Sequence, residues 1–308
     1  MTALPRDFTW PNGARLALSI VVNVEEGAEM NIVDGDASPE PVDELGAIPR
    51  RPVRVHGNES NYRYGIEAGA ERILGLLERR DMPFTATAAA LALERAPGLA
   101  RRLARADCEI ACHGYRWVHQ FRMGEDEERD FIRDAWQSIE RTAGARPTGW
   151  LSRFLHTENT QRLLVEQGFT YHMDDYSGDL PFWKRVDCGD GEHRPLLIVP
   201  YALDTNDMKM WTAPSLTPRD WAAYAVDTYD WLAREARESG PRMMSLGLHL
   251  RIIGRPGRIG ALERFLDHVR GHADVWVPTR QQIASAYAAA APAPAAGGDT
   301  NSDSDEGR

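Results

Sequence analysis

The most informative stretch of the chain is Glu109-Ile110-Ala111-Cys112-His113-Gly114-Tyr115-Arg116-Trp117. It predicts a short apolar strand, then a sharp turn, then a cation beside an aromatic ring. Gly114 permits the sharp turn, which leaves the imidazole of His113 at the carboxyl end of the strand. In parallel α/β barrels the chemistry is located at that end of the strands. We therefore expect His113 in the functional site. Arg116 and Trp117 are expected beside it, where a guanidinium and an indole suit a planar, polar ligand.

Similar apolar runs recur along the chain and alternate with amphipathic segments. The predicted strands are Leu16 to Val22, Phe84 to Thr87, Glu109 to Cys112, Thr148 to Leu151, Phe169 to His172, Leu196 to Pro200, Met244 to His249 and Asp274 to Val277. The predicted helices are Ala68 to Arg80, Ala96 to Ala106, Asp126 to Ala143, Asn159 to Gly168, Pro218 to Ser239 and Ile259 to His272. Several strands are continuously apolar, which is typical of strands covered on both faces. Repeated alternation of strand and helix predicts a single-domain parallel α/β barrel.

Two segments interrupt this alternation. The polar loop from Asn31 to Asn61 contains Pro and Gly, and its length predicts a lid or a contact between subunits. The segment 289–308 is rich in Ala and Pro and then in Gly, Asp, Ser and Glu, so it cannot bury a core and is predicted to be disordered. The catalytic domain is therefore expected over residues 1–288.

Composition excludes several classes of partner. The formal net charge of −10 disfavours nucleic acids and anionic membranes, which require a basic patch. The chain has no apolar run long enough to span a bilayer and no signal-peptide pattern at its start. Three cysteines, Cys108, Cys112 and Cys188, indicate a reducing compartment rather than a disulfide framework. We expect a cytoplasmic protein whose cysteines pack as small apolar residues rather than bind zinc.

The strand ends supply candidate catalytic residues. Glu25 and Glu26 end the first strand, and adjacent strand residues face opposite sides, so one should point into the barrel mouth while the other braces the loop. Glu29 is expected at the surface. His249 ends a later strand opposite His113, where an imidazole can serve as general acid or base.

Other polar side chains are candidate substrate contacts. Arg251 and Arg255 follow His249 and could bind an anionic group or form structural salt bridges. Asp175 and Asn206 follow the fifth and sixth strands and could position a substrate, although helix capping is the safer interpretation. Further candidates close the long loop and are Glu59, Tyr62 and Tyr64.

Three of these motifs, in this order, resemble the polysaccharide deacetylase superfamily, the NodB-homology or carbohydrate esterase 4-like proteins. They are Glu25-Glu26-Gly27, His113-Gly114 and Leu248-His249. Asp204-Thr205-Asn206-Asp207-Met208 and the run from Gly247 to Pro256 bring the chain closest to the metal-independent allantoinase branch of the superfamily. The resemblance implies a distorted (β/α)7-type barrel. In the wider family two histidines hold a catalytic metal, and Trp117 stands where the second is expected. We therefore expect no metal cofactor, and Zn²⁺ or another divalent metal held by Glu26 and His113 is the alternative.

The chain departs from the allantoinase branch at two strand ends. The run from Ser152 to Asn159 replaces a Gly-rich segment, and Tyr171-His172-Met173-Asp174-Asp175 replaces a run of the Tyr-Asp-Ser-Asp type. Both segments are expected to line the pocket. The sequence therefore leaves three substrate classes possible: allantoin, a related cyclic amide or ureide, and an acylated amine.

The function expected is hydrolysis of a non-peptide carbon–nitrogen bond, most simply the opening of a small cyclic amide or ureide. Either Glu25 or Glu26 would activate water, His113 and Arg116 would hold the oxyanion, and His249 would protonate the leaving nitrogen. The alternatives are a metal-dependent N-deacetylase of a carbohydrate or small acylated amine, and a non-catalytic ligand-binding barrel. The partner is a small molecule, and the long loop and nine tryptophans favour a homo-oligomer, a dimer or a tetramer.

Overall fold

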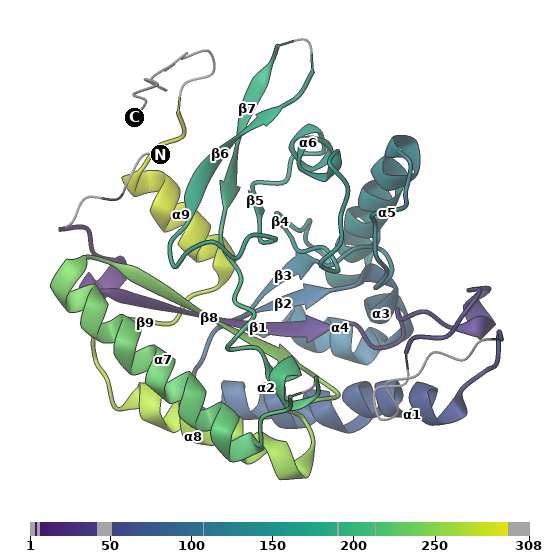
Figure 1. Ribbon diagram of the computed structural model, residues 1–308, viewed down its shortest axis with the longest axis horizontal. Coiled ribbons are helices and arrows are strands. Elements are labelled where there is room, and N and C mark those ends of the chain that lie inside the picture. Colours follow the sequence, from purple (N-terminus) through teal and green to yellow (C-terminus); the bar gives the residue numbers. More distant parts are fainter. Residues whose placement is uncertain are drawn as a thin grey trace, which may run out of the picture.

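The central strand β1 (Leu16–Val24) is buried at every residue, which accounts for its continuous apolar sequence. It belongs to a nine-stranded, mostly parallel sheet in the computed structural model, which describes residues 4, 7–41, 51–106, 108–189, 191–212 and 214–294. Within these residues the strand order is β6-β7-β5-β4-β3-β2-β1-β8, and β9 also pairs with β1 (Figure 1). The prediction of an α/β barrel is confirmed.

The remaining strands are β2 (Phe84–Ala88), β3 (Cys108–Cys112), β4 (Gly149–Trp150), β5 (Tyr171–His172), β6 (Phe182–Asp187), β7 (His193–Ile198), β8 (Arg242–His249) and β9 (Val275–Trp276). The helices of the described residues are α1 (His56–Tyr64), α2 (Ala70–Glu78), α3 (Ala90–Arg95), α4 (Pro97–Leu103), α5 (Glu125–Ala143), α6 (Thr160–Glu166), α7 (Pro218–Ser239), α8 (Pro256–Arg270) and α9 (Arg280–Ala290). A π-helical turn, Gly65–Gly69, joins α1 to α2.

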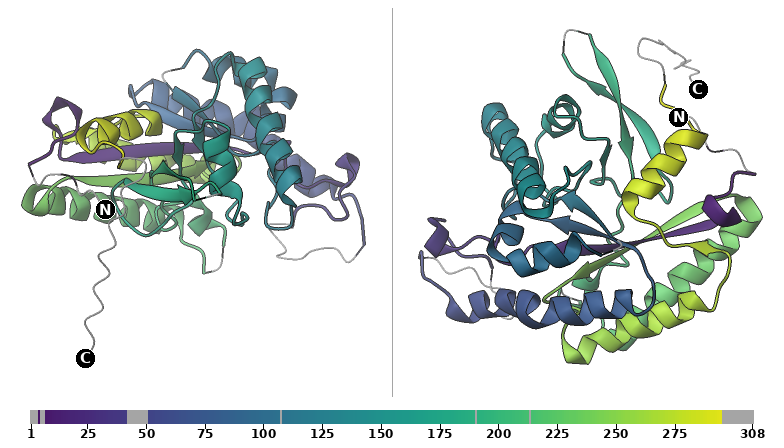
Figure 2. Two further views of the ribbon diagram at one scale, coloured as in Figure 1. Left: turned by 90° about the horizontal axis from the view of Figure 1, so that it is seen from above. Right: turned by 180° about the vertical axis from the view of Figure 1, so that it is seen from behind.

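An isolated bridge completes the ring of strands. It pairs Asn206 in parallel with Gly247, so the chain beyond β7 lies next to β8. With β6 outside as the antiparallel partner of β7, the strands enclose an interior in the manner of a distorted barrel. Helices form an outer layer around the strands, with α7 and α8 side by side below β8, and the β6–β7 hairpin extends away from them (Figures 1 and 2).

The last helix supplies a side chain to the interior. Arg280, the first residue of α9, is fully buried and donates hydrogen bonds to Ser19 of β1 at 3.1 Å, Ser245 of β8 at 2.9 Å and the carbonyl of Val199 at 2.5 Å. Its backbone amide donates to Thr85 of β2 at 2.8 Å. One residue therefore links three strands of the barrel and the chain after β7.

The structure corrects the predicted start of the C-terminal tail. Residues 289 and 290 belong to α9, Ala291 is buried, and Trp183 donates to the carbonyl of Ala291 at 2.7 Å. Alanine has the highest helix propensity, and the buried Tyr287 anchors this helix. Residues 295–308 lie outside the described residues, as does the part 42–50 of the predicted loop. No helix of the described residues is long and apolar enough to span a membrane.

Candidate active site

The register between β1 and β8 brings the acidic motif to the late histidine motif. Asn23 pairs with His249 across the two parallel strands, so the residues just beyond them meet at the carboxyl edge of the sheet. There Nη1 of Arg251 lies 2.7 Å from Oε2 of Glu25. Both side chains are 1% exposed, so this is an ion pair removed from solvent. A pair in this environment contributes orientation and charge balance more than net stability.

The Glu25 carboxylate lies between the two predicted histidines. Its Oε1 is 3.4 Å from Nε2 of His113 and 3.3 Å from Nε2 of His249. Both imidazoles are almost fully buried. Two predicted catalytic imidazoles therefore converge on one carboxylate oxygen of a third predicted residue, Glu25.

Glu26 faces the other way and braces the backbone. Its Oε1 accepts the amide of Arg251 at 3.0 Å, and its Oε2 accepts the amide of Glu25 at 3.2 Å. A Cβ on Gly65 would lie 2.6 Å from Oε1 of Glu26, so only glycine lets the π-helical turn approach this closely. The structure thus places Glu25 at the histidines and Glu26 against the outer helix.

A carboxylate holds His249 in place. Oδ1 of Asp207 lies 2.6 Å from Nδ1 of His249, while Oδ2 accepts the amides of His249 at 2.8 Å and Ile253 at 3.2 Å. Asp207 is fully buried. The proton of Nδ1 is therefore directed to Asp207, and Nε2 is the nitrogen that faces Glu25 and any ligand there.

A backbone carbonyl holds His113. Nδ1 of His113 lies 2.7 Å from the carbonyl oxygen of Leu151, directly after β4. Because a carbonyl only accepts, Nδ1 is the donor, and Nε2 is the ring nitrogen that faces Glu25.

Burial and charge separate the protonation states of the two glutamates and His249. Burial raises the pKa of Glu25, but the charges of His249 and Arg251 outweigh it and hold this pKa well below its usual range. Burial raises the pKa of Glu26. Burial lowers the pKa of His249, but Glu25 and Asp207 overcome it and raise this pKa to about 10. At neutral pH the site therefore contains a carboxylate at Glu25 and an imidazolium at His249.

Aromatic rings cover the guanidinium of Arg251. Its Cζ lies 4.5 Å from the ring centroid of Tyr62 and 5.1 Å from that of Trp117. A second cation, Arg153, lies 3.7 Å from the Trp117 ring and is paired with the buried Glu40. Two guanidinium groups therefore lie close to the Trp117 ring.

These residues do not fit a catalytic divalent metal. One oxygen of Glu25 is taken by Arg251, and the Glu26 oxygens accept backbone amides, so the predicted metal pair of Glu26 and His113 is not formed. A dication beside Trp117 would also face the charge of Arg251. In the described part of the chain, the clusters of His, Cys, Asp and Glu with metal-ligand spacing lie elsewhere.

Several predicted contacts have local structural partners instead. Arg116 binds Asp36 at 2.9 Å and the carbonyl of Glu29 at 3.1 Å, so it braces the loop after β1 and is not brought to Glu25. Glu59 pairs with Arg54 at 2.8 Å. The Cζ of Arg255 lies 3.6 Å from the ring centroid of Tyr64.

Of the two predicted caps, Asn206 is the N-cap of a 3-10 helix, Asp207–Met210, whereas Asp175 closes a local turn. Asp175 accepts the amide of Ser177 at 2.9 Å, and Asn206 accepts the amide of Met208 at 2.9 Å. The Nδ2 of Asn206 also donates to the hydroxyl of Tyr201 at 3.2 Å. Neither side chain contacts Glu25 in the described residues. Short polar side chains that follow a strand commonly bind nearby backbone amides in this way.

Sequence reasoning missed two acidic residues. Asp207 stands in a run of polar residues that is typical of a cap, and only the fold shows its contact with His249. Glu29, expected at the surface, is 7% exposed, and burial raises its pKa to about 7. Its carboxylate accepts the amide of Gly27 at 2.6 Å. An acidic spacing of Glu25-x-x-x-Glu29 at a strand end was the available signal.

A buried carboxylate between two imidazoles at the mouth of an α/β barrel defines a hydrolytic site of the acid–base class. Comparisons with known proteins agree with this class. Residues 61–172 match the polysaccharide deacetylase family model. A putative polysaccharide deacetylase of Schizosaccharomyces pombe (strain 972 / ATCC 24843) is 35% identical over 296 residues, which cover 91% of this chain and 92% of that protein.

Two solved structures are similar over almost the same span. A crystal structure of Puue allantoinase is 40% identical, with a TM-score of 0.85 and coverage of 91% of this chain and 92% of that chain. A probable polysaccharide deacetylase from Pseudomonas aeruginosa PAO1 is 38% identical, with a TM-score of 0.84 and coverage of 91% and 93%. The chain belongs to the polysaccharide deacetylase family, and with it to the hydrolases of carbon–nitrogen bonds other than peptide bonds.

Proposed function

We propose that this protein opens a small cyclic amide or ureide by metal-independent hydrolysis. The observation that carries the proposal is the convergence of His113, His249 and Arg251 on the carboxylate of Glu25. This cluster contains a base, an acid and a fixed positive charge, which together can replace the functions of a metal-bound water.

The first step is activation of water. Glu25 Oε1 and the Nε2 lone pair of His113 accept the two protons of one water molecule, which orients its oxygen toward a substrate carbonyl. This assigns His113 to the water instead of the oxyanion, because its Nδ1 proton is committed to Leu151. As water attacks, its proton moves to Glu25.

The second step is departure of nitrogen. The Nε2 proton of the His249 imidazolium moves to the amide nitrogen as the carbon–nitrogen bond breaks. The separation of 3.3 Å between Nε2 of His249 and Oε1 of Glu25 then allows the proton on Glu25 to return to His249. One water is consumed, and both side chains regain their starting protonation states.

The choice of a cyclic amide rests on the similarity to Puue allantoinase. A second candidate, N-deacetylation of an acylated amine, is supported by the names of the S. pombe and P. aeruginosa relatives.

The test is a hydrolysis panel with the purified protein in the presence and absence of a strong chelator. The panel contains allantoin, hydantoins, dihydropyrimidines, other cyclic imides and acetylated amino sugars. We expect chelator-resistant opening of a cyclic member, and Glu25→Gln as the inactive control. Chelator-sensitive release of acetate would instead establish the deacetylase, and folded protein without turnover on any member would favour a ligand-binding barrel.

We also propose that the protein forms a homo-oligomer, for which light scattering after size-exclusion chromatography is the direct measurement. The exposed Trp231 of α7 and Val53, which follows residues 42–50, are apolar groups available for contacts between copies. A monomer at all concentrations would refute this proposal without affecting the mechanism.

A further inference from the structure

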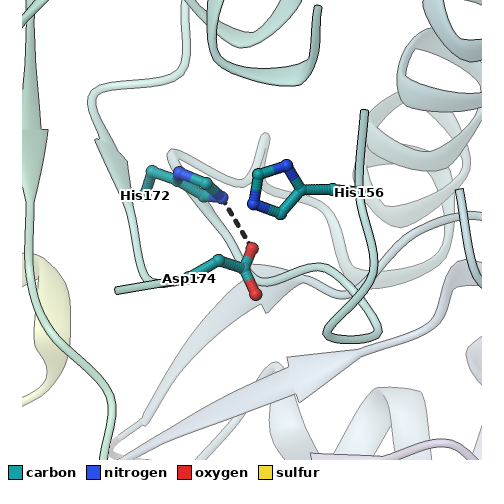
Figure 3. A group of neighbouring side chains, drawn as sticks. All are labelled: His156, His172 and Asp174. Carbon is teal, nitrogen blue, oxygen red and sulfur yellow. Dashed lines mark hydrogen bonds and ion pairs between the residues drawn. The ribbon is translucent and has the colours of Figure 1, made fainter. Parts of the chain in front are cut away.

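A second cluster of ionisable side chains lies at the carboxyl ends of β4 and β5. It consists of His156, His172 and Asp174, whose ligand atoms all lie within 4.8 Å of one another. Figure 3 shows His172 and Asp174 on one side and the ring of His156 opposite, turned toward them. Two imidazoles and one carboxylate at this spacing are a donor set typical of Zn²⁺ and related transition metals.

The cluster contains a buried polar atom without a partner. The side chains of His172 and Asp174 are 0% and 2% exposed. Oδ2 of Asp174 accepts from the amide of Ser152 at 2.7 Å and lies 2.6 Å from Nε2 of His172, whereas Oδ1 has no hydrogen-bond partner among the described residues. A buried carboxylate oxygen in this state costs free energy unless it is compensated, for example by a cation.

The outer nitrogens of both imidazoles have hydrogen-bond partners suited to a metal ligand. Nδ1 of His156 lies 2.9 Å from the carbonyl of Thr157, so it donates there and leaves Nε2 with a lone pair for a cation. Nδ1 of His172 lies 3.4 Å from the amide of Gln161, which can present its oxygen as acceptor when Nε2 of His172 binds a metal. Such partners fix the tautomer of ligating histidines in metal sites.

The loop that carries His156 is held in an unusual conformation. Phe154 has φ = +56°, a left-handed conformation that is rare for a bulky side chain. The buried carboxylate of Glu128 on α5 accepts from the hydroxyls of Thr157 and Thr160, which anchors the segment just after His156. The fold therefore presents His156 to His172 at a cost in backbone strain.

We propose that His156, His172 and Asp174 bind one divalent transition-metal ion of the Zn²⁺ class, distinct from the catalytic cluster. Two tetrahedral ligands of such an ion lie about 3.3 Å apart, so the pair of His172 and Asp174 opens slightly as the ion enters. The ion would join the ends of β4 and β5. Ser152, which donates to Asp174, directly follows Leu151, which holds His113.

The experiment measures binding of Co²⁺ and Zn²⁺ to the full chain after removal of metals by a chelator. Co²⁺ reports its ligands through visible absorption, and Zn²⁺ is followed by calorimetry and by the melting temperature. His156→Asn is the test variant because this residue is only partly buried and its loss is compatible with folding. His268→Asn is the matched control, since it belongs to the other described cluster of this spacing, with Asp230 and His272.

The wild type and His268→Asn should bind one tight equivalent of Co²⁺ and melt at a higher temperature with Zn²⁺. His156→Asn should lose at least about 100-fold in affinity for that equivalent, and Asp174→Asn should behave alike. Equal affinity in the wild type and His156→Asn, or loss only in His113→Asn, would overturn the proposal. Both readouts are independent of turnover, so failure of the proposed hydrolysis would not affect them.

Discussion

The contact between Asp207 and His249 makes a prediction about the alkaline limb of the pH–rate profile. In the proposed mechanism His249 must be protonated, so kcat/KM falls as the pH rises through its pKa of about 10. Asp207→Asn removes one of the two charges that raise this pKa. The limb should therefore move to lower pH.

The magnitude follows from the bond that is lost. A hydrogen bond to a charged group contributes about 1.5–3 kcal/mol, and one pKa unit corresponds to about 1.4 kcal/mol, so the limb moves by roughly one to two pH units. In Asp207→Asn the new side-chain oxygen must take the place of Oδ2 if it is to accept the backbone amides of His249 and Ile253. The NH₂ group then faces Nδ1 of His249. A donor facing Nδ1 disfavours the imidazolium, so at neutral pH the ring is a weaker acid even though its remaining proton is on Nε2.

The assay is the pH dependence of kcat/KM on the best substrate of the panel. Asp204→Asn is the control, because this exposed neighbour binds only the hydroxyl of Tyr224 in the described contacts. It should leave both rate and profile unchanged. An unmoved alkaline limb in Asp207→Asn, with a rate within about tenfold of the wild type, would refute the assignment of His249 as the acid.

Three further predictions follow from the same site. Glu25→Gln should lower kcat by at least about 10²-fold, because it removes the base. Glu26→Gln should lose one backbone contact and about 1–3 kcal/mol of stability, but should lower kcat by less than about tenfold. A steady-state assay in which Glu26→Gln is the slower variant would contradict the assignment of the base. Arg251→Met removes the cation closest to Glu25 and should destabilise the fold by about 3–5 kcal/mol in urea unfolding, and an unchanged midpoint would count against the buried pair. The folded-state pKa of His249 is about 10, above the value of about 6.5 in unfolded chains, so its contribution to stability is complete below about pH 6.5 and is lost as the pH rises through 10. A flat unfolding midpoint over that range would contradict this.

The alternation of strands and helices was predictable because buried parallel strands are apolar along their whole length. The predicted segments contain most of β1, β2 and β3, and α7 has the predicted bounds. The β6–β7 hairpin was missed at β6, because Phe182–Asp187 is only partly buried and lacks a regular apolar pattern. The helices α1 and α9 were missed as well, since their residues are mainly polar or small.

The residue types of the site were predictable, but their partners were not. Whether Glu25 or Glu26 faces the histidines depends on how the strand twists at its end, and the sequence leaves both open. The contact of Arg251 with Glu25 depends on the register that pairs Asn23 with His249. Asp207 reaches His249 only because the chain after β7 returns to β8.

The position of Arg280 sets a limit on when the barrel can form. Its guanidinium and amide bond groups of β1, β2 and β8, yet it follows all three strands in the sequence, and β9 reaches β1 from the same region. During synthesis at about 5–20 residues per second, the N-terminal strands therefore wait for the C-terminal segment before their interior polar groups are paired. Until then Ser19 and Ser245 can find only water or each other. The polar groups of the barrel interior are thus paired only once the segment that carries α9 has been made.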